Sequence, residues 1–395
     1  MAEPRAVMAG VTMVRWQRLF VGAAVLAAVL SPSACAYLQH PKFGAHPEGE
    51  RLERIRRSPQ HAGDMFRYPV DTPTLVDGQS TLSVLWGNLR EPGKNLRPAA
   101  PVPSVKTDLR ALDAGRDAVV WLGHSSYFVI LAGQRILIDP VFSPYAAPVS
   151  FSTRAFDGTT LYTAADMPPI DLLLITHDHW DHLDHATVTA LADKVRRVVV
   201  PLGVGAHLER WKIAPAKIDE VDWFEYVRAA DGLSVHAVPA RHYSGRWLTR
   251  NRTLWAGFVL ESDRRRLLFS GDTGYGPHVQ QIARRFDGFD LVALDMGQYD
   301  ERWPLIHLTP EEAALAAVEL RARSLLPGHV GRFSIARHAW SEPFERIDAA
   351  STGKPYRLLT PMIGEPVWIA DDQRFPRWWH DAARVARSPE PVTSR

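Results

Sequence analysis

Thr176-His-Asp-His-Trp-Asp-His-Leu-Asp-His185 is the most informative segment of this 395-residue chain. From His177 onward it places three histidines and a carboxylate in the pattern His-x-His-x-Asp-His. Crowded imidazoles would repel one another when protonated, whereas neutral imidazole nitrogens and carboxylate oxygens are common ligands of divalent metals. The apolar run Asp171-Leu-Leu-Leu-Ile175 directly before the segment predicts a buried strand. We therefore expect a metal site where the chain leaves that strand.

The same segment indicates two metals rather than one. His177 and His179 alternate along an extended loop and can point to one ion, while Asp181 and His182 turn toward a second. A site with two metals needs more than four ligands, so the remaining ligands must lie further along the chain.

Three later segments share one design, a short hydrophobic strand that ends at a side chain able to bind metal. They are Val235 to His242, Arg266-Leu-Leu-Phe-Ser-Gly-Asp272 and Ser324-Leu-Leu-Pro-Gly-His329. Strand ends fix the positions of ligands better than mobile loops do. A single strand-end Asp or His is usually structural, but in this order behind the first motif the three predict the missing ligands.

This order of motifs resembles the metallo-β-lactamase superfamily, and it resembles in particular the branch of N-acyl-phosphatidylethanolamine-hydrolysing phospholipase D and its bacterial relatives. The similar segments lie between about residues 118 and 335. They are Trp121 to Ser125, Ile136 to Ser143, Thr176 to Asp184, Trp255 to Gly257, Phe269 to Tyr275, Arg285 to Asp290, His307 to Ala313 and Pro327 to Phe333. The resemblance implies an α+β fold, a four-layer αββα sandwich with a binuclear site at one edge, here with an N-terminal extension.

The resemblance also implies the ligand set. One metal would take His177, His179 and His242, the other Asp181, His182 and His329, with Asp272 between the two. Two such metals can hold a bridging hydroxide as the nucleophile, because a bound water loses its proton near neutral pH. Zinc suits nitrogen and oxygen ligands without thiolates, and iron or manganese remain alternatives.

Two further residues receive roles near the metals. His307 precedes Thr309-Pro-Glu-Glu312, which predicts a helix start with Thr309 as N-cap and Glu312 completing a capping box. The resemblance places His307 in the active site, so His307 and Asp181 are the predicted catalytic residues; the alternative for His307 is an ordinary surface histidine. Asp139 follows the strand Arg135-Ile-Leu-Ile138 and is either a carboxylate that orients a ligand imidazole or a turn residue before Pro140.

The N-terminus predicts the compartment. Arg15 and Arg18 precede a twelve-residue apolar run, residues 19–30, which is short for a transmembrane helix and suits a signal peptide. Ser31-Pro-Ser-Ala-Cys35 follows and contains the only cysteine of the chain. Its position resembles a bacterial lipoprotein signal, with Cys35 lipidated, although Pro32 departs from that pattern. Simple cleavage near Ala34 or Ala36 and a retained anchor are the alternatives.

The predicted organisation has four parts. Residues 1–35 form the signal peptide, 36–110 an extension that wraps the core, 111–340 the hydrolase domain and 341–395 a C-terminal cap. Within the extension, residues 41–74 are expected to be an extended arm and Trp86 to Arg90 a short helical piece. The aromatic segment Arg374-Phe-Pro-Arg-Trp-Trp379 is a structural cap or a lipid-contacting patch. A composition of 46% hydrophobic residues indicates a globular protein, and a net charge of +2 gives no reason to propose nucleic acid as a partner.

We therefore predict a metal-dependent hydrolase of the bacterial envelope, on its periplasmic side, with membrane association through a lipoprotein anchor. The expected reaction is the phospholipase D type of phosphodiester cleavage on N-acyl-phosphatidylethanolamine-like phospholipids. The alternatives are a lactonase or other acyl hydrolase on the same fold, and an envelope protein without catalysis. Relatives in the branch form dimers, so a homodimer is a further expectation from the resemblance.

Overall fold

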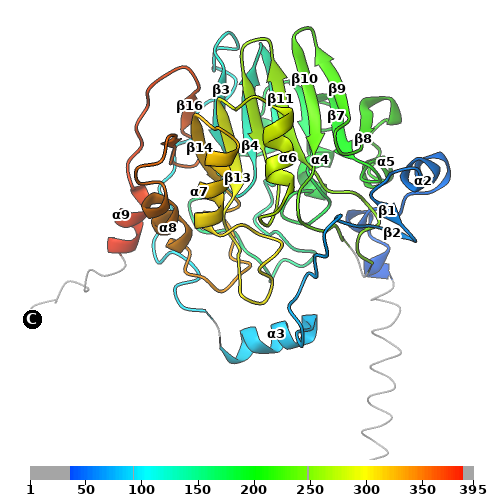
Figure 1. Cartoon of the computed structure of the whole chain (residues 1–395), viewed down its shortest axis with the longest axis horizontal. Helices are drawn as coiled ribbons and strands as arrows, with labels where there is room; N and C mark the ends of the chain where they lie inside the picture. Colours follow the sequence, from blue (N-terminus) through cyan, green and yellow to red (C-terminus); the bar gives the residue numbers. More distant parts are fainter. Residues whose placement is uncertain (1–35, 92, 247–248, 386–395) are drawn as a thin grey trace, which may run out of the picture. The chain divides into compact units, whose positions relative to one another are not determined.

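The computed structural model describes residues 36–91, 93–246 and 249–385. Two seven-stranded sheets form the centre of the part from residue 44 onward (Figure 1). In spatial order, the first sheet contains β16 (Pro366–Trp368), β3 (Ala118–Trp121), β4 (Tyr127–Leu131), β5 (Gln134–Ile138), β6 (Ile170–Leu174), β7 (Val195–Pro201) and β8 (Ile218–Val221). Strands β5 to β8 run parallel to one another, and β16, β3, β4 and β5 are antiparallel.

The second sheet is also mixed. In spatial order it contains β15 (Arg357–Leu358), β14 (Ser324–Gly328), β13 (Leu291–Asp295), β12 (Arg266–Phe269), β11 (Gly257–Ser262), β10 (Leu233–Val238) and β9 (Tyr226–Ala230). Strands β12 to β15 are parallel, and β9 to β12 are antiparallel. The arginine-rich segment between β11 and β12 is the tight turn that joins this antiparallel pair.

Alternation along the strands explains why the two sheets stack. In β4, Tyr127, Val129 and Leu131 belong to the cluster between the sheets, whereas Phe128 and Ile130 belong to a second cluster on the outer face. Neighbouring side chains of a strand point to opposite faces, and all five are buried. Both faces of the sheet are therefore covered, as the near-continuous apolar runs require.

Helices supply the two outer layers. Helices α4 (His185–Leu191) and α5 (Gly205–Arg210) place Val188, Leu191 and Leu208 in the outer cluster of the first sheet. Helices α6 (His278–Arg285), α7 (Pro310–Glu319) and α8 (Glu342–Ala350) cover the second sheet, and α6 and α7 lie in front of its strands in Figure 1. The predicted four-layer αββα sandwich is confirmed.

The extension before β3 contains more regular structure than the predicted extended arm. Helix α2 (Gly49–Arg56) buries Ile55, and β1 (His61–Ala62) pairs with β2 (Met65–Phe66) as a hairpin. The predicted helical piece is present and longer, as α3 (Thr81–Arg90). Backbone hydrogen bonds join the extension to distant segments, for example Phe66 N–H to Asn251 O and Val102 N–H to Asp157 O. Residues 36–43, which include the 3-10 helix η1 (Pro41–Phe43), form a separate unit.

The segment predicted as a C-terminal cap is part of the sandwich. Its strand β16 pairs with β3 at one edge of the first sheet, and β15 pairs with β14 at one edge of the second. Helix α9 (Trp378–Val385) follows, with the side chains of Trp378 and Trp379 buried against Phe344 of α8. The tryptophan pair is therefore core, which favours the structural alternative for this segment.

Two predictions concern residues outside the described ranges. The signal peptide 1–35 and the lipidation site Cys35 both lie there. Among the residues that the structure describes, none of the helices has the length and apolar character needed to cross a membrane. The short 3-10 helices η2 (Ala164–Asp166) and η3 (Pro215–Lys217) complete the regular elements of this part of the chain.

Candidate metal centre

The predicted ligands come from four segments that meet at one edge of the sandwich. His177 to His182 lie in the loop between β6 and α4, and His242 follows β10. Asp272 follows β12, and His329 directly follows β14. The carboxyl ends of parallel strands share one edge of a sheet, which is why residues separated by about 150 positions converge. The structure brings all seven predicted ligands together.

The first group of ligands is formed by His177, His179, His242 and Asp272, whose donor atoms all lie within 4.8 Å of one another. The His177 Nε2 and His179 Nδ1 atoms are 2.9 Å apart, and the His242 Nε2 atom is 3.3 Å from the same Nδ1. The Asp272 Oδ2 atom lies 3.7 Å from His177 Nε2 and 3.6 Å from His242 Nε2.

The second group is formed by Asp181, His182 and His329, and His124 joins it. The Asp181 Oδ2 atom lies 3.7 Å from His182 Nε2, 3.9 Å from His329 Nε2 and 2.8 Å from His124 Nε2. The other oxygen of Asp272 faces this group, because its Oδ1 atom is 3.1 Å from His182 Nε2 and 3.0 Å from His329 Nδ1. Asp272 thus lies between the two groups, with one oxygen toward each.

The donor atoms fit divalent ions. Nitrogens bound to one tetrahedral zinc at about 2.1 Å lie about 3.4 Å apart, close to the spacings in the first group. Two atoms in the centre, His182 Nε2 and Asp272 Oδ1, are buried and lack a hydrogen-bond partner among the described residues. Such atoms are costly unless something compensates them, and a cation between the two groups would do so. The side chains therefore form clusters that can bind metal.

Several ligand imidazoles are held by their second ring nitrogen. His182 Nδ1 lies 2.8 Å from Asp139 Oδ2, and His242 Nδ1 lies 2.9 Å from the carbonyl oxygen of Ile306. Thr176 donates from its backbone and its hydroxyl to the same Asp139 carboxylate, at 2.7 and 2.6 Å. An imidazole that donates one N–H to an oxygen presents its other nitrogen to the metal. Asp139 is therefore in place to orient His182, while also fixing the loop through Thr176.

Burial sets the protonation of the first group. It lowers the pKa of His177 and of His242 well below the ordinary value, with smaller contributions from neighbouring histidines. Burial would by itself raise the pKa of Asp181, but the charge of His182 and the hydrogen bond from His124 hold it below its usual range. Neutral imidazoles and ionised carboxylates are the forms that bind divalent metals. His182 differs, because against the effect of burial the neighbouring carboxylates of Asp272 and Asp181 raise its pKa well above the ordinary value, so it would lose a proton on binding an ion.

The backbone at this edge adopts conformations that few residues tolerate. His124, Asp139 and His329 have φ values of 55°, 42° and 60°. Left-handed conformations of non-glycine residues are uncommon, and they cluster at functional sites because the surrounding structure must hold them. Gly271 has φ 59°, and a Cβ there would lie 2.9 Å from Thr176 Cβ, so only glycine fits directly before Asp272.

His307 lies beside the ligands and points toward them. Its Nδ1 atom is 2.8 Å from Asp295 Oδ2, and its ring stacks on that of His329 with centroids 5.0 Å apart. Helix α7 begins three residues later with the predicted N-cap Thr309 and capping-box Glu312, which fixes the backbone. A ring nitrogen of His307 also lies within 4.8 Å of donor atoms of Asp272 and His329, so these three side chains form a third group that could hold an ion. The side chain is therefore oriented by Asp295 and lies among the metal ligands.

Two residues of the centre were not assigned a role from the sequence. His124, in the loop after β3, donates or accepts a hydrogen bond with Asp181 at 2.8 Å, and burial followed by the nearby His329 lowers its pKa to about 3. Asp295 ends β13 and holds His307. Leu291-Val-Ala-Leu-Asp295 has the same strand-end pattern as the segment before Asp272, and this signal could have revealed it.

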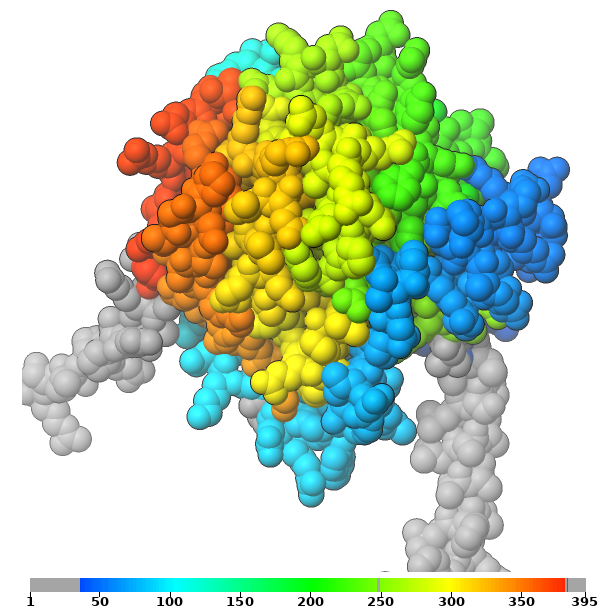
Figure 2. Space-filling model, in the orientation of Figure 1, coloured from blue at the N-terminus to red at the C-terminus, as the bar shows by residue number. Residues whose placement is uncertain are grey.

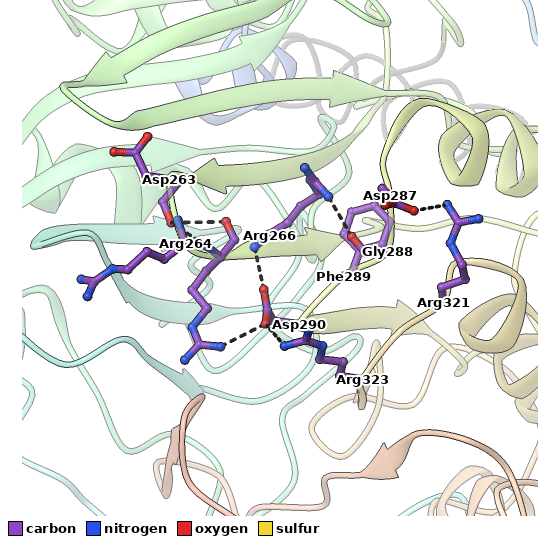
Figure 3. Close-up of a pocket in the computed structure, with 11 residues that line it drawn as sticks. Asp263, Arg264, Arg266, Asp287, Gly288, Phe289, Asp290, Arg321 and Arg323 are labelled. Atoms are coloured by element: carbon purple, nitrogen blue, oxygen red, sulfur yellow. Dashed lines mark hydrogen bonds and ion pairs between the residues drawn. The ribbon is translucent and has the colours of Figure 1, made fainter.

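A solvent-open pocket of about 370 Å³ lies elsewhere on the protein (Figure 3). It is lined by the turn between β11 and β12 and by the segments that precede β13 and β14. These are the amino ends of strands whose carboxyl ends carry Asp272, Asp295 and His329. Arginine and aspartate side chains pair across it, so this pocket is separate from the metal centre.

Comparison with known proteins agrees with the geometry. The model of the beta-lactamase superfamily domain matches residues 134–330. An uncharacterized protein of Mycobacterium tuberculosis is 40% identical over 287 residues, covering 72% of this chain and 77% of that protein. N-acyl-phosphatidylethanolamine-hydrolyzing phospholipase D 1 of Caenorhabditis elegans is 29% identical over 310 residues, covering 72% of this chain and 85% of that protein.

Among solved structures, a possible metal-dependent hydrolase from Veillonella parvula has a similar fold. Its TM-score is 0.52 at 14% sequence identity, with 64% of this chain and 99% of that chain covered. The matched residues 134–330 include β5 to β14 and every predicted metal ligand. From its sandwich, its clustered histidines and aspartates and these relatives, the chain belongs to the beta-lactamase superfamily.

Proposed function

We propose that this metallo-hydrolase is a phosphodiesterase of the phospholipase D type, acting on N-acyl-phosphatidylethanolamine-like phospholipids. The observation that carries the proposal is the position of Asp272, with one oxygen toward each of two ligand groups, beside the oriented His307. A pair of cations suits a phosphodiester, whose oxygens gain charge in an in-line displacement. The C. elegans relative is named for hydrolysis of this lipid class.

The roles of the residues follow from the distances. One ion would be held by His177, His179 and His242. The other would be held by Asp181, His182 and His329, and Asp272 would contact both. Zinc is the proposed metal because every donor is nitrogen or oxygen, as zinc accepts, and iron or manganese would fit the same set. When bound, the ions supply Lewis acidity and make water a nucleophile at neutral pH.

The remaining residues of the centre would orient the ligand side chains and transfer protons. Asp139 and the Ile306 carbonyl keep the rings of His182 and His242 turned toward the centre. Asp295 and His307 Nδ1 share a hydrogen bond of 2.8 Å, which turns Nε2 toward the centre. When the ring carries a proton on Nε2, that N–H can pass it to the departing alcohol oxygen or donate to a phosphoryl oxygen. His124 hydrogen-bonds Asp181 at 2.8 Å and would hold that carboxylate in place.

The proposed location is the periplasmic side of a bacterial envelope, with Cys35 as the lipid anchor. The apolar run 19–30 and the segment before Cys35 support this part of the proposal. Mass spectrometry of the mature N-terminus tests it: a diacylated or triacylated Cys35 is expected, and a free N-terminus near Ala34 or Ala36 would contradict lipidation. A homodimer belongs to the proposal only through the resemblance, and light scattering in solution measures it.

The decisive experiment is hydrolysis of N-acyl-phosphatidylethanolamine and phosphatidylethanolamine by metal-loaded protein, with products identified by mass spectrometry. Phosphatidic acid should form, and it should disappear in His179→Ala. A panel of lactones is assayed with the same preparation. Lactone opening without phosphatidic acid would assign the acyl-hydrolase alternative, and no turnover by protein that holds two metal ions would contradict the proposed reaction.

A further inference from the structure

Helix α3 exposes an apolar face that nothing in the described structure covers. Leu82, Leu85, Trp86 and Leu89 are 77%, 57%, 59% and 70% exposed, and none of the ten residues of the helix is buried. Their spacing of i, i+3, i+4 and i+7 places all four on one side of the helix. Large hydrophobic side chains exposed together on a soluble protein usually mark an interaction surface.

The helix is well formed despite this exposure. Ser80 is the N-cap, and its hydroxyl accepts from Ser83 N–H at 3.1 Å while the Ser83 hydroxyl accepts from Ser80 N–H at 2.7 Å. This capping box fixes the start of the helix. The apolar face is thus presented by an ordered element, which Figures 1 and 2 show projecting from the sandwich.

Contacts place α3 at the edge of the metal centre. Arg302 lies in the loop between β13 and His307, and its guanidinium donates to Asn88 Oδ1 at 2.8 Å and approaches the Val84 carbonyl at 3.5 Å. Arg97, shortly after the helix, donates to the carbonyl of Ala155 at 2.6 Å. Both partner loops leave the carboxyl ends of parallel strands, β13 and β5, so the helix and the metal ligands share one edge of the sandwich.

Two further hydrophobic side chains are exposed in loops at the same edge of the sandwich. Phe151, in the same loop as Ala155, is 88% exposed, and Ile335, in the loop after His329, is 39% exposed. The other described hydrophobic side chains with more than half their surface exposed are those of α3 and Tyr226 on β9. Exposed apolar surface is therefore concentrated around the loops of the metal centre.

Area and charge indicate what covers this face. Large side chains have on the order of 200 Å² of surface each, so the four residues of α3 expose roughly 500 Å². A standard protein interface needs about 800 Å² from each partner, more than this helix offers. The helix contains no acidic residue, and the exposed charges from Arg90 to Arg97 are three basic (Arg90, Lys94, Arg97) and one acidic (Glu91). Leucines and a tryptophan beside basic residues suit the interface of an anionic bilayer.

We propose that the apolar face of α3 docks onto an anionic phospholipid bilayer and holds the edge of the sandwich that carries the metal ligands against it. The inference deepens the proposed function, on which it rests for the choice of a lipid surface. Insertion of Leu82, Leu85, Trp86 and Leu89 among the lipids buries the exposed face, while Arg90 and Lys94 stay at the headgroups. The link from α3 through Arg302 to the loop before His307 keeps the centre at the membrane surface.

The test is hydrogen–deuterium exchange of the full chain with Cys35→Ser, so that the predicted lipid anchor does not contribute. Addition of vesicles of phosphatidylglycerol and phosphatidylethanolamine should slow exchange of the peptide 79–91 by at least about threefold, and phosphatidylcholine vesicles should slow it less. The double variant Leu85→Glu/Leu89→Glu should lose this protection. The control variant Leu315→Glu carries the same substitution at an exposed position of α7 and should retain the protection by vesicles.

A parallel assay connects docking with turnover. The rate on vesicle lipid relative to the rate on a monomeric short-chain analogue should fall at least about tenfold in the double variant and stay unchanged in Leu315→Glu. Unchanged exchange of residues 79–91 with vesicles would overturn the inference, as would protection by a dimer in the absence of lipid. Failure of the proposed function would give a different result. Neither the vesicle lipid nor the short-chain analogue would then be hydrolysed, while hydrogen–deuterium exchange would still report docking of α3.

Discussion

Strands β12, β13 and β14 carry charged residues at both ends, and the two ends differ in burial and in the partners of their carboxylates. At the carboxyl ends, Asp272, Asp295 and His329 are 3%, 2% and 1% exposed. At the amino ends, in the pocket of Figure 3, the side chains of Asp290 and Arg323 are 13% and 77% exposed. The same scaffold thus holds a buried cluster of imidazoles and carboxylates at one edge and solvent-open ion pairs at the other.

The difference shows how a metal site is distinguished from a structural charge network. Asp290 is neutralised by arginine, with Arg265 at 3.0 Å and Arg323 at 3.2 Å, and needs no further cation. Asp272 faces only histidines, and one of its buried oxygens has no hydrogen-bond partner in the described structure. Buried carboxylates surrounded by imidazoles rather than guanidinium groups match the donor set of a divalent metal, so this edge can hold one.

The largest difference in activity is expected when an Asp→Asn substitution at the carboxyl ends of these strands is compared with the same substitution at their amino ends. Asp272→Asn should lower hydrolysis by at least about 10³-fold, because the amide cannot neutralise two ions. Metal analysis of the purified variant should show loss of at least one ion. Asp290→Asn is the matched control and should keep wild-type metal content and rate. Full metal occupancy in Asp272→Asn would refute its place between the ions.

A smaller loss is expected when the oriented histidine is changed. His307→Gln should lower kcat by about 10²–10⁴-fold, the usual contribution of a positioned proton donor, without loss of metal. Asp295→Asn should give a smaller decrease, since the ring remains but its orientation is weakened. His236→Gln, on β10 beside Glu261 at 3.1 Å, serves as a control with no expected change. Metal loss in His307→Gln would instead make this residue a ligand.

Metal affinity should respond to the carboxylate behind the ligands. Asp139→Asn should weaken metal binding by about 10–100-fold, as is usual for partners that orient ligand histidines. Competition with a chelator measures it. Asp171→Asn is the control, because Asp171 is half-buried on β6 and accepts from the Arg135 backbone at 2.9 Å, away from the ligands. Equal metal affinities of Asp139→Asn and the wild-type protein would show that Asp139 is a turn residue that only fixes Thr176.

The opposite edge should affect stability alone. Asp290→Ala leaves Arg265 and Arg323 without their shared carboxylate and also removes an acceptor for Arg266 N–H. The free energy of unfolding should fall by about 1–3 kcal/mol. Arg323→Ala, mostly exposed, should cost less than about 1 kcal/mol. Chemical denaturation measures both, and a change in kcat in either variant would contradict the separation of the two edges.

The sequence predicted the parts of the fold that local patterns encode. The strand before His177 runs from Ile170 to Leu174, and the helix after His307 begins at Pro310 with Thr309 as its cap. Pairing between strands that are far apart in the sequence is not encoded by such local patterns. β16 pairs with β3 about 250 residues earlier, so the segment predicted as a cap belongs to the first sheet. His124 was passed over for the same reason, because its partner Asp181 lies 57 positions away.

The sequence by itself determined the superfamily, the seven candidate ligands and the strand ends that carry them, because metal-binding side chains in a fixed order are a local and rare pattern. Tertiary structure alone decided that Asp272 faces two groups, that Asp295 orients His307 and that α3 lies at the edge of the centre with its leucines exposed. These depend on distances between segments far apart in the chain. Such distances arise only when two sheets pack and bring the carboxyl ends of their parallel strands to one edge.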